Sequence, residues 1–159
     1  MIKVVIIGYG SAGRRHARIL EKNFNHVQIY ILSKQKIKKF YTFKKINYIK
    51  EINPDYIIIA SETFDHLSQL RYLEKNFTDK TILVEKPLFH RLYNLKTKKN
   101  NVFVNYNLRF HPYIIKLKKI LKKEKIYDIK FLTNSYFPSW RNNVSHKKNY
   151  TTLNQKVVE

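Results

Sequence analysis

Gly8-Tyr9-Gly10-Ser11-Ala12-Gly13 is the stretch of sequence that decides the fold. This G-x-G-x-x-G motif directly follows Val4-Val5-Ile6-Ile7, an apolar run typical of a buried strand. Helix-forming residues fill 11–23, so the glycines are predicted to lie on a turn between a strand and a helix. There the first glycine allows the tight turn, the second lets backbone approach a pyrophosphate, and the third lets helix pack on strand. The motif predicts a dinucleotide site, with a purely structural turn as the alternative.

The start of this predicted helix is the expected phosphate contact. Ser11 and Ala12 would present unpaired backbone N–H groups and the positive end of the helix dipole to an anion. Arg14, Arg15 and His16 follow the last glycine. From the residues alone, His16 is interpreted as a surface or packing histidine.

Further strands and helices alternate along the chain. Apolar runs predict strands at residues 27–32, 56–60, 81–84 and 102–104, and leucines at three-residue spacing predict a helix over 65–76. The charged segment 34–40 is compatible with a short helix, whereas 48–52 fits no single element. This βαβ pattern predicts an α/β fold with a doubly wound parallel sheet.

The pattern changes in the last third of the sequence. Residues 112–123 predict a basic amphipathic helix with its apolar side chains inside. Partial alternation predicts a strand over 126–137, and a polar tail follows. We expect a dinucleotide-binding domain over residues 1–125 and, over 126–159, the incomplete start of a second, sheet-based α+β domain.

Composition limits the class of protein. The formal charge of +21 invites a nucleic-acid-binding interpretation, but the lysines are spread along the whole chain, which favours a general composition bias over a specific binding face. There is no cysteine, so neither disulfides nor thiolate metal sites are possible. No apolar run approaches membrane-spanning length and no signal-peptide pattern opens the chain, so a cytoplasmic protein without a membrane partner is expected.

The end of the second strand bears on the choice of cofactor. An acidic residue about 20 positions after the glycines accepts a hydrogen bond from the ribose 2′-OH in NAD sites. Ser33 holds that place here, followed by Lys34 and Lys36. A hydroxyl with cations suits a 2′-phosphate better, so NADP is favoured, with NAD as the alternative. Ser33 could instead cap a helix.

Two further strand ends carry polar residues. Ala60-Ser61-Glu62-Thr63 follows one strand, with His66 in the next helix; these residues could contact a cofactor, or Thr63 or Asp65 could cap that helix. Glu85-Lys86-Pro87 follows the next strand. Lys86 could donate to a substrate oxygen or transfer a proton, with Pro87 fixing the exit path of the chain through a cis bond. A surface ion pair and a turn is the alternative.

Four motifs taken together resemble one family. They are Gly8 to Gly13 with His16, Ala60-Ser61-x-Thr63-x-x-His66, Glu85-Lys86-Pro87-Leu88, and Asn105-Tyr106-Asn107-x-Arg109-Phe110-x-Pro112. In this order they are similar to the Gfo/Idh/MocA family of NAD(P)-dependent oxidoreductases, a resemblance that covers about residues 2–141. The segment 135–141 resembles a subgroup associated with sugar or nucleotide-sugar metabolism for surface glycans.

The resemblance implies a role for each matching residue. The Rossmann domain of such a protein would hold the cofactor pyrophosphate with the three glycines and meet the adenosine ribose or its phosphate with Ser33 and Lys34. Residues expected beside the cofactor or substrate are Ala60, Ser61, Thr63, His66, Glu85 at the nicotinamide, Lys86 at the substrate, Arg109 in the substrate cleft, and Trp140 and Arg141 from the second domain. The substrate would be a small sugar-type molecule.

The sequence also departs from the family pattern. Members are typically more than twice as long, form homo-oligomers through the additional domain, and carry a later Asp-x-x-x-His motif whose histidine is the usual acid/base. No such motif follows Arg141, and His146 lies in a lysine-rich polar stretch. We therefore keep two expectations open: hydride transfer at a secondary alcohol or carbonyl carbon, or cofactor binding without turnover.

Overall fold

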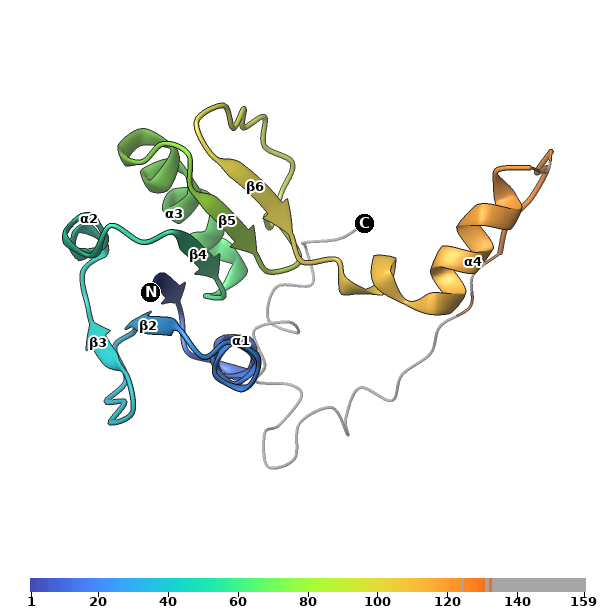
Figure 1. The fold of residues 1–159 in the computed structure, drawn as a ribbon. Coiled ribbons are helices and arrows are strands. Elements are labelled where there is room, and N and C mark those ends of the chain that lie inside the picture. Colours follow the sequence, from blue (N-terminus) through green and yellow to red (C-terminus); the bar gives the residue numbers. More distant parts are fainter. Residues whose placement is uncertain (124, 131, 133–159) are drawn as a thin grey trace, which may run out of the picture. The chain divides into compact units, whose positions relative to one another are not determined.

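A six-stranded parallel sheet with helices on both faces forms the first of two compact units, which runs from Met1 to Tyr106 (Figure 1). The structure is a computed structural model and describes residues 1–123, 125–130 and 132. The strand order is β3-β2-β1-β4-β5-β6. The elements of this unit are β1 (Ile2–Ile7), α1 (Ser11–Asn23), β2 (Val27–Leu32), β3 (Tyr41–Phe43), the 3-10 helix η1 (Ile46–Tyr48), α2 (Ile49–Ile52), β4 (Tyr56–Ile59), α3 (Thr63–Asn76), β5 (Thr81–Val84) and β6 (Asn101–Val104). The order confirms the predicted doubly wound α/β fold.

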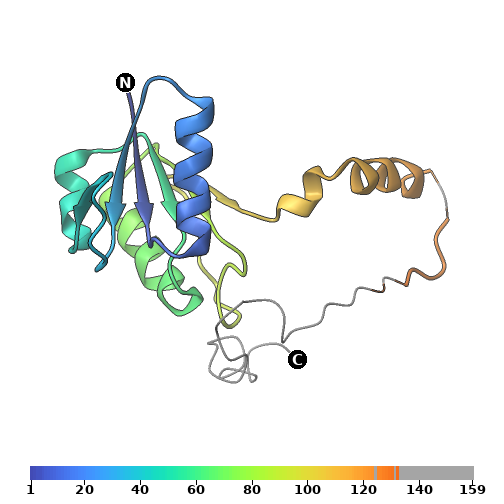
Figure 2. The same ribbon diagram turned by 90° about the horizontal axis from the view of Figure 1, so that it is seen from below.

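The core consists of two apolar layers, one on each face of the sheet. Alternate residues of β1 point to opposite faces: Val5 and Ile7 pack against α3, whereas Val4 and Ile6 pack against α1. Figure 2 shows the two helices on opposite sides of the strands. Burial on both faces explains why the central strands are continuous apolar runs.

Most predicted elements agree with the structure, and several differ. The helix over 11–23 and the strands over 27–32 and 81–84 are confirmed with the same bounds. The segment 34–40 is not helical, and the three-residue strand β3 follows it. The predicted helix over 65–76 begins two residues earlier. In the predicted strand over 126–137, the described residues 126–130 and 132 have no strand structure; the others lie outside the described residues.

The connection from β5 to β6 contains no helix, although parallel strands are usually joined by one. The end of this connection is fixed by Asn100, whose side chain is buried. Its Nδ2 donates to Glu74 Oε1 at 2.9 Å and to the Phe77 carbonyl at 3.1 Å. Its Oδ1 accepts from the backbone N–H of Lys80 at 3.0 Å. These bonds replace a helix in fixing the start of β6, and thereby the end of β6 at the site.

The second unit begins at Asn107 and contains the 3-10 helix η2 (Asn107–Phe110) and α4 (Pro112–Leu121). His111 caps α4, accepting from the Tyr113 N–H. The prediction that this helix has its apolar side chains inside is wrong for the described residues, because Ile114 and Ile120 are 39% and 50% exposed. The described part of this unit has no second apolar element to cover them. The domain boundary at 125 stays a prediction.

Candidate functional site

The glycine loop joins β1 to α1 at the carboxyl edge of the sheet. Gly8 has φ 93°, a conformation that side chains disfavour, and an added Cβ would lie 2.7 Å from the Ala60 carbonyl oxygen and from the Ser61 nitrogen. A Cβ on Gly13 would overlap the Gly8 carbonyl oxygen. Gly8 and Gly13 are therefore required by the turn and by the close contact between α1 and β1.

Gly10 differs from the other two because nothing lies within 4 Å of the place where its Cβ would be. It is the N-cap of α1, makes no side-chain cap, and the first turn holds no acidic residue. The backbone N–H groups of Ser11 and Ala12, at the positive end of the helix dipole, donate to no other described residue. This is the geometry that a pyrophosphate requires.

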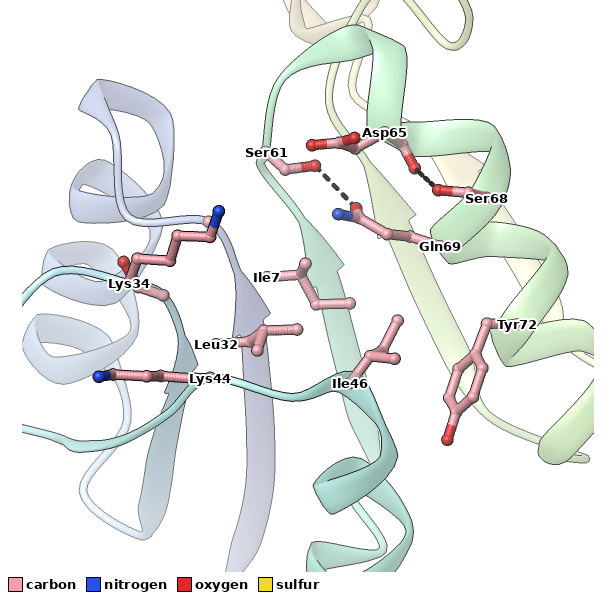
Figure 3. Close-up of a pocket in the computed structure, with 12 residues that line it drawn as sticks. Ile7, Leu32, Lys34, Lys44, Ile46, Ser61, Asp65, Ser68, Gln69 and Tyr72 are labelled. Atoms are coloured by element: carbon pink, nitrogen blue, oxygen red, sulfur yellow. Dashed lines mark hydrogen bonds between the residues drawn. The ribbon is translucent and has the colours of Figure 1, made fainter.

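A cavity of about 510 Å³ lies beside this loop, between the ends of β1 and β2 and helix α3 (Figure 3). Ser33 and Lys34 line one side of it. Their contact with an adenosine ribose stays a prediction. The alternative that Ser33 caps a helix is wrong, because its Oγ accepts from the Gln35 N–H at 3.1 Å in a turn. Ser33 and Lys34 thus reach the same cavity from the end of β2.

The other side of the cavity is formed by the end of β4 and by α3. Ser61 follows buried Ala60, and its Oγ donates to Gln69 Oε1 at 2.7 Å. Thr63 is buried in the first turn of α3 and does not cap it; the N-cap is Glu62, which makes no side-chain cap bond. Asp65 is likewise not the N-cap of α3, and it lines the cavity. Neither capping alternative is therefore realised.

His66 is a core residue that joins two loops of the site. It is 1% exposed, and its Nε2 lies 3.2 Å from the Ser61 carbonyl while Nδ1 lies 3.1 Å from the Leu88 carbonyl and 3.2 Å from that of Pro87. A neutral imidazole donates from only one nitrogen, so the tautomer decides which loop is bonded. His66 therefore stabilises the walls of the site and is not among the residues that line the cavity.

Glu85 is the centre of a polar cluster at the end of β5. Its Oε1 lies 2.7 Å from His16 Nε2 and accepts from Asn105 Nδ2 at 2.7 Å. Burial alone would raise the pKa of this carboxyl, but the hydrogen bonds of His16 and Asn105 and the Lys86 N–H outweigh it and lower the pKa. Glu85 is therefore held as a carboxylate.

Lys86 follows in an exposed position, and its peptide bond to Pro87 is cis, as the sequence allowed. Its backbone N–H donates to Glu85 Oε2 at 3.3 Å. Lys86 follows Glu85 at the carboxyl end of β5, and Glu85 meets Asn105 at the end of β6 because Val84 pairs with Val104. Arg109 belongs to the second unit, in η2. Trp140 and Arg141 lie outside the described residues.

Several residues near the site carried no role in the sequence analysis, among them His16, Asn105, Lys44 and Gln69. His16 had been interpreted as a surface or packing residue and Asn105 appeared only within a motif, yet both bond Glu85. Lys44 and Gln69 line the cavity. The motifs that contain His16 and Asn105 were the signals for these two residues, whereas Lys44 and Gln69 belonged to no motif.

Two kinds of feature are absent from the described residues. No group of three or more His, Asp or Glu side chains there could hold a metal ion. No helix of that part of the chain is long and apolar enough to cross a membrane.

Comparison with known proteins places these observations in a family. A family model described as "Oxidoreductase family, NAD-binding Rossmann fold" (GFO_IDH_MocA) matches residues 2–106. The match covers the glycine loop, the cavity and the Glu85 cluster. A search of curated proteins finds no match.

Several solved structures share the fold. The WlbA (WbpB) dehydrogenase from Thermus thermophilus, solved with NAD and UDP-GlcNAcA, has 22% identity and a TM-score of 0.63, over 79% of this chain and 48% of that one. The WlbA dehydrogenase from Chromobacterium violaceum, with NADH and UDP-GlcNAcA, has 16% identity and a TM-score of 0.66, over 77% and 40%. For the scyllo-inositol dehydrogenase from Lactobacillus casei, with NAD(H) and scyllo-inositol, the values are 20%, 0.61, 77% and 41%. The chain spans less than half the length of these proteins.

Proposed function

The chain belongs to the Gfo/Idh/MocA family of NAD-binding oxidoreductases, and on this premise we propose that it binds NADP at the glycine loop and takes part in hydride transfer. The acceptor or donor would be a secondary alcohol or carbonyl carbon of a sugar or nucleotide sugar. The observation that carries the proposal is Gly10, where open space meets the uncapped N-terminus of α1.

The residues present fit the phosphate end of such a cofactor. The backbone of Gly10, Ser11 and Ala12 would hold the pyrophosphate, because the first turn of α1 has no acidic residue to repel it. Gly8 and Gly13 keep this turn close to the sheet. The fit to the pyrophosphate therefore depends on backbone N–H groups and not on side chains.

The choice of NADP over NAD rests on the end of β2. Ser33 and Lys34 line the cavity there, and no acidic residue follows β2 before the next strand. A carboxylate at this place would accept from a ribose 2′-OH and repel a 2′-phosphate, whereas a hydroxyl and an ammonium favour the phosphate. Solved relatives of the fold were crystallised with NAD or NADH, so this preference would distinguish the chain from them.

The Glu85 cluster would serve the reacting end. The nicotinamide, when bound, supplies the hydride acceptor or donor. Glu85, fixed as a carboxylate by His16 and Asn105, would orient that ring. Lys86, exposed beside it, would bind the substrate oxygen and hold or release its proton. Arg109 in the substrate cleft, and Trp140 and Arg141 at the cofactor, are assigned by resemblance alone.

The substrate class comes from the relatives. The solved structures named above hold UDP-GlcNAcA or scyllo-inositol, which are hydroxylated rings. Oxidation or reduction at a ring carbon needs a hydride donor or acceptor and a group that carries the proton. Lys86 can carry the proton. Assembly into a homo-oligomer belongs to the same proposal.

Binding without turnover is the second candidate. Among the described histidines near the site, His16 is bonded to Glu85 and His66 is buried between backbone carbonyls, which leaves Lys86 alone to carry a proton. If Lys86 does not move this proton unaided, the chain would bind the cofactor and transfer no hydride.

Titration of NADPH and NADH with fluorescence detection tests the proposal. We expect saturable binding of both, tighter for NADPH, and weaker binding of both by the Gly10→Val variant, whose side chain would fill the open space over α1. A wild-type chain that binds neither dinucleotide at millimolar concentration contradicts the proposal. Oxidation of bound NADPH by keto forms of sugars or nucleotide sugars, measured by absorbance at 340 nm on the same sample, separates turnover from binding.

A further inference from the structure

Lys44 reaches the proposed cofactor cavity from a strand that the sequence analysis did not predict. β3 pairs in parallel with β2, with Leu32 opposite Phe43. The Ser33 N–H donates to the Phe43 carbonyl at 3.0 Å. The residues after these two strands, Ser33 and Lys44, are therefore neighbours at the carboxyl edge of the sheet.

Two lysines lie on the same side of this cavity. Lys34 and Lys44 both line it and are both exposed. In Figure 3 the Lys34 side chain extends toward α3, whereas the Lys44 side chain extends away from it. Asp65, Ser68 and Gln69 lie across from them, on α3. The side formed by the ends of β2 and β3 therefore carries two positive charges and no carboxylate.

Neither of these ammonium groups forms an ion pair within the described residues. Lys39, close to them in sequence, lies 2.7 Å from Glu21 and has its charge balanced in this way. A pair of cations without a carboxylate partner is suited to a dianion. A lysine presents its charge at the end of a flexible stem, so Lys44 can turn toward a phosphate placed over Ser33.

We infer that Lys44 is a specificity-determining residue, the second cation of a site in which Ser33, Lys34 and Lys44 hold the 2′-phosphate of NADP. This inference rests on the proposed function, because it requires a dinucleotide with its adenosine ribose at the end of β2. It adds to that function a residue from a different strand, placed there by the β2–β3 pairing and not by any local motif.

Binding constants for NADPH and NADH, measured at one fixed salt concentration, test the role of Lys44. In Lys44→Met, which keeps most of the side-chain length, NADPH should bind about ten-fold more weakly, while NADH changes less than two-fold. Lys44→Arg should retain at least half of the preference. Lys45→Met is the matched control: it removes the same charge one residue away, outside the cavity, and should leave both constants within two-fold.

Three results would overturn the inference. Lys44→Met could leave NADPH binding unchanged, weaken both dinucleotides equally, or act no more strongly than Lys45→Met. In each of these cases the wild-type chain still binds a dinucleotide, so the proposed function stands. A wild-type chain that binds neither NADPH nor NADH would remove the proposed function and the inference together. Circular dichroism of each variant, expected to match wild type for these exposed positions, separates lost binding from lost folding.

Discussion

His16 Nε2 lies 2.7 Å from Glu85 Oε1, and this contact joins the helix that begins at the glycine loop to the end of β5. The two side chains are each 15% exposed, so water screens the pair only partly. Asn105, from the end of β6, donates to the same oxygen. One carboxylate thus connects the phosphate end and the reacting end of the proposed cofactor site.

His16→Ala should raise the pKa of Glu85. Burial opposes the charged carboxylate, and without His16 only Asn105 and the Lys86 N–H would counter it. Carboxyl ¹³C NMR titration measures the pKa directly. His26→Ala, which alters an exposed histidine, should leave the Glu85 titration unchanged; an unchanged titration in His16→Ala would show that the contact has no electrostatic effect.

Glu85 should make the free energy of unfolding depend on pH in the acidic range. Because the folded chain lowers the pKa of this group, its ionised form stabilises the fold above the ordinary carboxyl value of about 4.5. That contribution is lost as the pH falls through the lower native pKa. Glu85→Gln should therefore reduce the free energy of unfolding by about 1 kcal/mol at pH 7, and by progressively less below pH 4.5. Urea unfolding across this range measures the difference; a constant difference would contradict the account.

The first two glycines should respond differently to alanine. Gly8→Ala places a Cβ 2.7 Å from the Ala60 carbonyl oxygen at a φ of 93°, and should cost at least about 2 kcal/mol of stability. Gly10→Ala adds a Cβ in open space, so stability should change by less than about 0.5 kcal/mol. Thermal unfolding of the pair checks this. Equal losses would mean that the loop packs differently.

His66→Leu should destabilise the chain by about 2–3 kcal/mol. Leucine is apolar and comparable in size to histidine, so the change fills the same space. It removes the ring nitrogens that face the carbonyls of Ser61 and Leu88. Hydrogen exchange should increase in whichever of the loops after β4 and β5 accepts the hydrogen bond of the ring. His26→Leu, on an exposed histidine whose side chain makes no hydrogen bond to a described residue, is the control. Wild-type exchange in both loops would contradict the bridging role.

The sequence was sufficient for elements whose pattern is local. The apolar runs of β1, β2 and β5 and the glycine spacing predicted the sheet and the phosphate turn, because burial on both faces and a forced positive φ leave a direct mark on composition. β3 was missed, since three residues carry too little pattern and its position depends on pairing with β2.

Residues that meet only through the fold could not be predicted in the same way. His16 and Glu85 are 69 positions apart, and only the packing of α1 on the sheet brings them together. Lys44 reaches the cavity through strand register. The apolar face of α4 predicted burial, but whether such a face is covered depends on another element, and the described residues of its unit provide none.

The most direct test of the central claim is the position at which a dinucleotide binds. An ¹⁵N-labelled sample titrated with NADPH should show saturable amide shifts at Gly10, Ser11 and Ala12 and at Ser33, the backbone positions around the phosphates. These shifts should saturate together, with one dissociation constant. Shifts confined to other parts of the chain, or none that saturate, would contradict the assignment of this loop as the cofactor site.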